Sequence, residues 1–226
     1  MHMAIEPSPA LLSELYGQRF PAADRRAKDV LWRILCRDFF QRWVPRDARL
    51  LDVGAGLCEF VNHIEAGEKW ALDMNPEVVR HAAPGVRTHL GPAHELGWLE
   101  TGSMDVVFAS NVFEHFLTKD DVLTALREIH RVLRPGGRLL VLGPNIRFTA
   151  GVYWDFFDHH TPLSERSMAE ALGLAGLRVE HVQARFLPYT TKSRLPSWPV
   201  LVRLYLRLPL LHLLFGKQMF LVAVRP

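Results

Sequence analysis

The sequence predicts an α/β fold in which a mainly parallel sheet is covered by helices on both faces. From residue 49 to residue 174, short apolar runs of strand length alternate with segments of helical spacing. Two further strand-like runs close the chain without a simple helix between them. With 226 residues, 49% of them hydrophobic, the chain is long and apolar enough for one such domain with an appendage.

Each element is predicted from its apolar period and from the residues that end it. Pro45 ends the first helix and Pro76 stands at a helix start, whereas Ser164 is a candidate N-cap and Gly176 follows a helix end. The segment 134–137, Arg-Pro-Gly-Gly, reads as a turn after a clear helix. We expect strands at 49–53, 69–73, 86–90, 104–110, 138–142, 178–186 and 218–224, and helices at 29–44, 59–65, 76–81, 119–133 and 164–174.

The chain divides into a helical lead over residues 1–47 and a main domain over residues 48–226. The main domain carries an apolar insertion at about 187–217. The formal net charge of +3 and the absence of a dedicated basic domain argue against a nucleic-acid partner. Two cysteines, Cys36 and Cys58, form neither a disulfide framework nor a zinc motif. No signal-peptide pattern stands at the start, so we expect a cytoplasmic protein.

A glycine-rich turn after the first strand predicts a nucleoside cofactor. Gly54 and Gly56 follow Asp52 and permit a sharp turn with close approach of a ligand to the backbone. Asp73 comes 21 positions after Asp52, at the end of the second strand, where a carboxylate accepts both ribose hydroxyls. Glu59 stands where a dinucleotide fingerprint has its third glycine, which argues against a nicotinamide-dependent oxidoreductase.

Four segments in this order resemble the class I S-adenosylmethionine-dependent methyltransferases. They are Leu51-Asp52-Val53-Gly54-Ala55-Gly56, residues 71–75 (ALDMN), residues 104–115 (MDVVFASNVFEH) and residues 133–140 (LRPGGRLL). The resemblance covers residues 48–182 and implies a Rossmann-like, seven-stranded, mostly parallel sheet whose last strand is antiparallel. It also implies S-adenosylmethionine as cofactor. Cys58 departs from the pattern, because many members have glycine there, and we expect it to pack as a small apolar residue.

The resemblance implies cofactor contacts from several loops. Gly54 and Gly56 would approach the methionine part, Asp52 would hold the turn, and Asp73 would accept the ribose hydroxyls. The remaining expected contacts are Met74 against the adenine, Ala93 and His94 in the loop after the third strand, and Asn111 facing the transferred methyl.

Three histidines are candidates for the base that a hydroxyl acceptor requires. The sulfonium methyl is already activated, so the transfer needs alignment and, for a hydroxyl, a proton acceptor. His115 follows the fourth strand, and His159 and His160 follow the fifth. A packing role for His115 and an orienting role for one of the pair are the alternatives. Ubiquinone-type O-methyltransferases carry a metal-associated Glu-x-x-Glu-His group here. In this chain Asn111 replaces the first glutamate, so we expect no metal.

The acceptor is expected to contact residues near the ends of the fourth and fifth strands. The candidates are Glu114, Asn145, Arg147, Tyr153 and Trp154, and the aromatic residues among them fit a core as well as a flat pocket. We expect a small-molecule acceptor with a saccharide or lipid-linked hydroxyl, or alternatively a phenolic or quinone-like one. A non-catalytic module that binds S-adenosylmethionine is the alternative of another class.

The segment 195–215 is too apolar for an ordinary surface loop. Charged, polar and proline residues interrupt it, so it is a poor membrane span; they are Arg203, Arg207, His212, Pro199 and Pro209. Three interpretations remain: a lid over the site, a homodimer contact, or peripheral contact of Leu195–Phe215 with a membrane surface.

Overall fold

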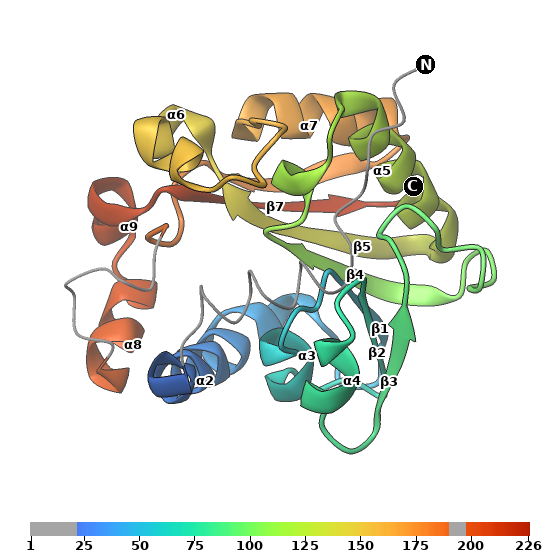
Figure 1. Cartoon of the computed structure of the whole chain (residues 1–226), viewed down its shortest axis with the longest axis horizontal. Helices are drawn as coiled ribbons and strands as arrows, with labels where there is room; N and C mark the ends of the chain where they lie inside the picture. The colour runs from blue at the N-terminus through green and yellow to red at the C-terminus, as the bar shows by residue number, and fades with distance from the viewer. Residues whose placement is uncertain (1–21, 190–197) are drawn as a thin grey trace.

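The structure is a computed structural model that describes residues 22–189 and 198–226. The expected lead before residue 22 and part of the apolar insertion, including Leu195, lie outside the described residues. Figure 1 shows a central sheet with helices packed on its two faces.

The sheet confirms the predicted topology. Its seven strands lie in the order β3-β2-β1-β4-β5-β7-β6. All neighbouring pairs from β3 to β5 are parallel, and β7 runs antiparallel to both β5 and β6. The bounds are β1 Arg49–Val53, β2 Glu68–Asp73, β3 Val86–Leu90, β4 Met104–Ser110, β5 Leu133–Pro144, β6 Arg178–Gln183 and β7 Gln218–Val224.

Two apolar cores lie on opposite faces of this sheet because successive strand residues point to opposite sides. Leu51 and Val107 belong to the core covered by α5 (Lys119–Val132) and α7 (Glu165–Leu174). Leu50 and Phe108 belong to the core covered by α2 (Ala22–Asp38) and α3 (Glu59–His63). Both faces being covered explains why the strands read as nearly continuous apolar runs. The remaining helical elements are η1 Phe40–Trp43, α4 Glu77–His81, η2 Phe113–His115, α6 Ile146–Thr149, η3 Ala150–Asp155, α8 Pro199–Arg207 and α9 Pro209–Phe215.

The first helix differs from its predicted bounds of 29–44. It begins by Ala22, ends at Asp38, and continues after Phe39 as the short η1 turn. The break brings two neighbouring aromatic residues into the second core. The Phe39 ring stacks on Phe186 with centroids 4.1 Å apart, and Phe40 is fully buried. Apolar spacing alone did not locate this break.

The predicted turn 134–137 is instead the first part of β5. Met104 pairs with Leu133 and Val106 pairs with Arg138, so the intervening residues form an irregularity within the ladder. Gly136 has φ of +78°, a conformation that glycine adopts at little cost. The glycines therefore mark a bulge-like kink rather than a connection outside the sheet.

Candidate cofactor and acceptor site

The glycine turn connects β1 to α3 through residues with left-handed backbone conformations. Gly54, Gly56 and Cys58 have φ values of +67°, +54° and +63°. A Cβ on Gly54 would lie 2.4 Å from Cγ2 of Val112, in the loop after β4. The turn therefore tolerates no side chain at Gly54.

Cys58 is fully buried and its thiol contacts the carbonyl of Val78 at 3.5 Å. Burial, followed by nearby carboxylates, raises the pKa of this thiol to about 12, which keeps it neutral. The expected packing role is what this environment supports. The positive φ is also the physical reason why glycine suits the position.

Asp73 ties the glycine turn to the end of β2. Its Oδ2 accepts the Gly56 amide at 2.7 Å and its Oδ1 accepts the Asn75 amide at 2.7 Å. Burial raises the pKa of the carboxyl, and these two amides oppose the shift. Met74 follows directly and is half-buried. Each carboxylate oxygen has a further lone pair, so the predicted ribose contact stays compatible with these bonds.

Asp52 lies beneath the turn and is 2% exposed. Burial is the main reason why its pKa lies well above the usual range, and the charges of Glu59 and Asp73 add to the shift. A carboxyl in this setting favours its protonated form, in which it donates as well as accepts a hydrogen bond.

The loops after β3 and β4 close the same edge of the sheet. Nδ1 of His94 is buried and has no hydrogen-bond partner among the described residues, and the ring lies 6.1 Å from that of Phe116. The neighbouring Ala93 is half-buried. Asn111 has φ of +53°, is exposed, and donates to the Ser110 hydroxyl at 3.1 Å.

These observations fit a nucleoside cofactor at this edge. The left-handed turn at Gly54 admits only glycine, which lets a ligand approach the backbone, and the buried Nδ1 of His94 is a polar atom that a purine edge would satisfy. The predicted cofactor residues therefore lie on adjacent loops, as parallel strands require at their carboxyl ends.

His115, in η2 after β4, is oriented by Asp158. Its Nδ1 lies 3.0 Å from the Asp158 carbonyl oxygen and 3.3 Å from the Asp158 carboxylate. Because a carbonyl only accepts, Nδ1 carries the hydrogen, and in the neutral ring Nε2 holds the lone pair. Burial lowers the pKa of His115, but the bond to Asp158 and the charge of Glu114 outweigh it, so the pKa is raised.

Glu114 lies buried beside this pair and is 4% exposed. Burial raises the pKa of its carboxyl to about 7. Its backbone carbonyl accepts the amides of His160 and Thr161, which joins the loop after β4 to the segment after η3. The residue predicted to bind substrate therefore also holds two parts of the site together.

His159 is buried next to His115, with ring centroids 5.0 Å apart. It stacks on Phe156 at 4.8 Å, and its Nδ1 lies 3.3 Å from the Tyr189 hydroxyl. The side chain of His160 is exposed. The structure thus brings one histidine of the pair to His115 and directs the other outward.

Glu114, His115 and His159 each offer a ligand atom, and these atoms lie within 4.8 Å of one another. A carboxylate with two imidazoles is a donor set that first-row transition metals accept. The absence of a metal, which the sequence indicates, stays a prediction.

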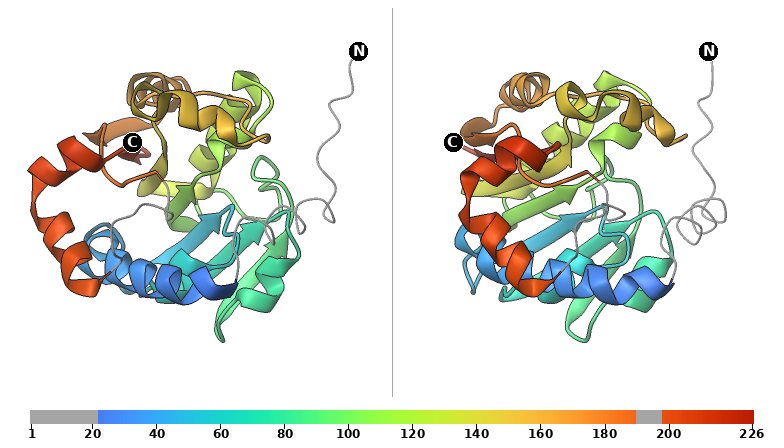
Figure 2. Two further views of the ribbon diagram at one scale, coloured as in Figure 1. Left: turned by 60° about the vertical axis from the view of Figure 1, so that its left-hand side comes forward. Right: turned by 90° about the vertical axis from the view of Figure 1, so that its left-hand side faces the viewer.

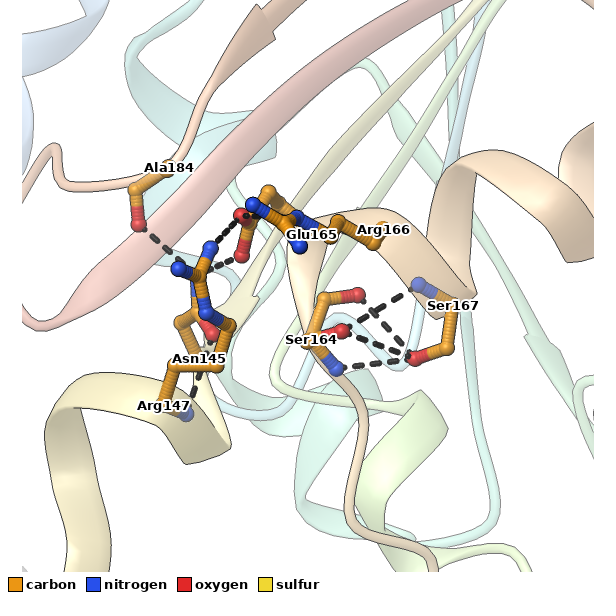
Figure 3. A network of polar contacts seen from close by, with 7 residues as sticks. All are labelled: Asn145, Arg147, Ser164, Glu165, Arg166, Ser167 and Ala184. Atoms are coloured by element: carbon orange, nitrogen blue, oxygen red, sulfur yellow. Dashed lines mark hydrogen bonds and ion pairs between the residues drawn. The ribbon is translucent and has the colours of Figure 1, made fainter.

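Asn145 and Arg147 point toward Glu165 rather than to an open site (Figure 3). The Asn145 amide nitrogen donates to Glu165 at 2.6 Å and to the Ala184 carbonyl at 2.9 Å, and Arg147 pairs with the same carboxylate. Both amide hydrogens of Asn145 are used, so this fully buried side chain supports the end of β5. Arg147 keeps an exposed guanidinium edge.

The aromatic pair divides between core and surface. Tyr153 is fully buried and donates to the Thr161 carbonyl at 2.8 Å, whereas Trp154 is 58% exposed. Sequence reasoning missed Asp158 and Tyr189, which contact His115 and His159. The acidic residue directly before the histidine pair was the available signal for Asp158, whereas nothing near Tyr189 indicated its contact.

Solved structures show which class of protein has this architecture. An S-adenosylmethionine-dependent methyltransferase from Archaeoglobus fulgidus aligns with a TM-score of 0.65 and 17% identity, over 94% of this chain and 99% of that one. A TehB-like methyltransferase from Corynebacterium glutamicum gives 0.62 and 18%, over 97% and 100%. The fold is therefore that of the class I methyltransferases.

Sequence comparison finds methyltransferases that are similar to part of the chain. Residues 51–141 match the family described as a methyltransferase domain. An uncharacterized methyltransferase of Mycobacterium bovis is 32% identical over 151 residues, 65% of this chain and 55% of that protein. The demethylmenaquinone methyltransferase of Chlorobaculum parvum is 28% identical over 126 residues, 52% and 51%. The chain spans about half the length of the curated relatives it matches. The match of residues 51–141 to a methyltransferase domain, together with the fold, indicates S-adenosylmethionine as the cofactor.

Proposed function

We propose that the protein is an enzyme that transfers a methyl group to the hydroxyl of a small molecule, a saccharide or a lipid-linked intermediate. The observation that carries the proposal is the His115–Asp158 pair at the carboxyl end of β4. An imidazole oriented through Nδ1 presents Nε2 as a proton acceptor, which is what a hydroxyl needs when its oxygen forms a new bond to carbon.

The bound cofactor supplies an activated methyl and a neutral thioether leaving group. The residues of the chain supply the rest. Gly54 and Asp73 would hold the cofactor at the edge of the sheet, and exposed Asn111 follows β4 in the loop that leads to His115. Nε2 of His115 would take the proton that the acceptor hydroxyl releases on methylation. Asp158 stabilises the imidazolium that forms.

A phenolic or quinone-like acceptor is the second candidate. The Chlorobaculum relative is named a demethylmenaquinone methyltransferase, and a relative from Cereibacter sphaeroides, 32% identical over 123 residues, is named a ubiquinone/menaquinone biosynthesis C-methyltransferase, so these names support the quinone-like ring rather than the hydroxyl. The rings of Phe156, His159 and Tyr189 lie together beside His115, and aromatic side chains bind flat rings well.

The helical lead is proposed to brace the catalytic domain of residues 48–226. Lys28 pairs with Glu59 at 2.7 Å, and Asp29 lies 2.7 Å from Nε2 of His63. Both contacts join α2 to α3, directly after the glycine turn. This supports the interpretation of α2 as a cover for one face of the sheet.

Formation of S-adenosylhomocysteine with a panel of acceptors tests the activity. The panel contains a free saccharide, a polyprenyl-linked saccharide, a catechol and a menaquinol precursor, with the methylated atom assigned by mass spectrometry and NMR. Methylated oxygen on a saccharide or lipid-linked acceptor is expected. Methylation of carbon or nitrogen would contradict the proposed role of the base, and cofactor binding without turnover on any acceptor would favour a non-catalytic module.

A further inference from the structure

Helices α8 and α9 expose a continuous set of large apolar side chains. Each of these residues has between 40% and 73% of its surface exposed, and the two helices are consecutive in the chain. We call this set the apolar arm patch: Trp198, Val200, Leu201, Leu204, Leu208, Leu210, Leu213, Leu214 and Phe215. Clusters of this kind mark interaction surfaces, because a monomer rarely exposes so many neighbouring apolar side chains.

The helices are held to the body by their other faces. Leu206 packs against the core beneath α2, and the Tyr205 hydroxyl donates to the Phe186 carbonyl. His212 is buried, with Nδ1 2.8 Å from the Gln183 side chain and Nε2 2.9 Å from the Tyr205 carbonyl. The patch is therefore the outer face of an anchored arm, of which α8 packs beside α2 and α9 leads on to β7 (Figure 2).

The charge near the patch is positive. From residue 181 to the end of the chain there are seven Lys or Arg and no Asp or Glu. Arg207 is exposed at the end of α8. Arg203 is 42% exposed and lies 3.3 Å from Asp38. Apolar side chains beside arginines fit the interface of an anionic bilayer, where the apolar groups insert and the guanidinium groups meet phosphates.

The patch lies at the edge of the sheet that carries the site. The Lys217 carbonyl, directly after α9, accepts the Asn145 amide at the end of β5. Tyr189, on the segment that leads toward the arm, contacts His159. A surface bound to the arm is therefore close to the residues proposed to receive the acceptor. None of the described helices has the length and apolar character needed to cross a bilayer.

We propose that the apolar arm patch binds the surface of an anionic phospholipid bilayer and brings the site to an acceptor in that bilayer. The part about the acceptor rests on the proposed function, whereas binding to the bilayer does not. Charge favours an anionic bilayer over a second copy of the chain as the occupant of the patch. The segment from residue 181 to the end has no acidic residue, so a second copy packed against the patch would place Arg207 near other arginines.

Vesicle flotation with the full chain tests the proposal without an activity readout. We expect binding to phosphatidylcholine vesicles that contain phosphatidylglycerol, and weaker binding to phosphatidylcholine alone. The double variant Leu213→Ser/Leu214→Ser should lower the partition coefficient by about tenfold or more, because two exposed leucines lose their apolar surface. Arg207→Glu should remove most of the preference for anionic lipid.

The matched control is Val79→Ser/Leu174→Ser, whose apolar side chains are 54% and 67% exposed on α4 and α7. It should float as the wild type does. Absence of flotation of the wild type, or equal binding by the Leu213→Ser/Leu214→Ser variant, would overturn the proposal. A doubled mass in analytical ultracentrifugation that the arm variant abolishes, without flotation, would assign the patch to a second copy instead. Calorimetry with S-adenosylhomocysteine tests the proposed function separately. Its result does not depend on whether the protein floats with vesicles.

Discussion

The edge of the sheet predicted to bind the cofactor and the neighbouring region proposed for the acceptor are built in different ways. On the cofactor side, Gly54, Gly56 and Asp73 are held by backbone conformation and by hydrogen bonds to backbone amides. On the acceptor side, His115 depends on Asp158, which is 43 residues away in the chain. The first region is specified by short motifs, whereas the second forms only when distant loops pack together.

This difference indicates which of the two regions tolerates amino-acid substitutions. A turn that leaves no space for a Cβ restricts the residue regardless of the acceptor. Side-chain contacts between loops can be exchanged without disturbing the sheet, so they are where acceptor choice resides. The two regions should therefore respond differently to substitution, in binding of the cofactor on one side and in turnover on the other.

The largest effect is expected for Gly54→Ala. The new Cβ would lie 2.4 Å from Val112 Cγ2 at a residue with φ of +67°, which costs about 1–2 kcal/mol in conformation and about 1–3 kcal/mol in overpacking. Affinity for S-adenosylhomocysteine should fall by about a hundredfold or more in calorimetry. Gly173→Ala is the control, because a Cβ there meets nothing within 4 Å. If Gly54→Ala bound S-adenosylhomocysteine as tightly as the wild type does, backbone conformation would not distinguish the cofactor edge from the acceptor region.

His115→Gln should lower kcat by about a hundredfold while leaving cofactor affinity within about twofold. In the wild type, turnover should rise with pH as His115 loses its proton. Asp158→Asn removes a group that raises the pKa of His115, so this rise should move to lower pH. Exposed His160 provides the comparison, and His160→Gln should lower turnover less. Equal turnover of His115→Gln and the wild type would show that His115 is not the base.

Asp73→Asn should weaken cofactor binding by about tenfold to a hundredfold. One amide hydrogen would then face the Gly56 or Asn75 amide, which also donates, so one bond is lost and replaced by repulsion. Calorimetry with S-adenosylhomocysteine measures the change. The control is Glu100→Gln at an exposed position, which should bind as the wild type does. Loss of turnover without loss of affinity would place Asp73 on the acceptor side instead.

Ionisation of buried Glu114 should lower the stability of the folded protein as pH rises. Its pKa is about 7 in the folded state and 4.5 as its ordinary value, so the unfolded chain releases this proton first. The free energy of unfolding should fall by about 3 kcal/mol between these pH values from this group. Urea unfolding of Glu114→Gln should show a smaller fall, and an identical pH profile would contradict the assignment.

The smallest effect is expected for removal of divalent metal ions. Dialysis against a chelator should leave turnover unchanged, because Asn111 stands where a first carboxylate ligand would be expected. Loss of turnover that Zn²⁺ restores would instead assign a metal to Glu114, His115 and His159.

The sequence by itself determined the seven strands and the match of residues 51–141 to a methyltransferase domain, and it predicted the cofactor edge. Each of these depends on short-range features: apolar period, the glycine turn from Gly54, and the spacing of Asp52 and Asp73. The predicted ribose contact stays a prediction, although the position of Asp73 agrees with it.

Tertiary structure alone decided the helix break at Phe39 and the pairing of His115 with Asp158. It also decided that the Asn145 side chain bonds to Glu165, and which face of α8 and α9 is exposed. These outcomes depend on contacts between residues far apart in the chain, and such contacts leave no period or spacing in the sequence. A local motif is visible because its geometry is fixed within a few bonds, whereas a packed contact exists only after the sheet has brought its parts together.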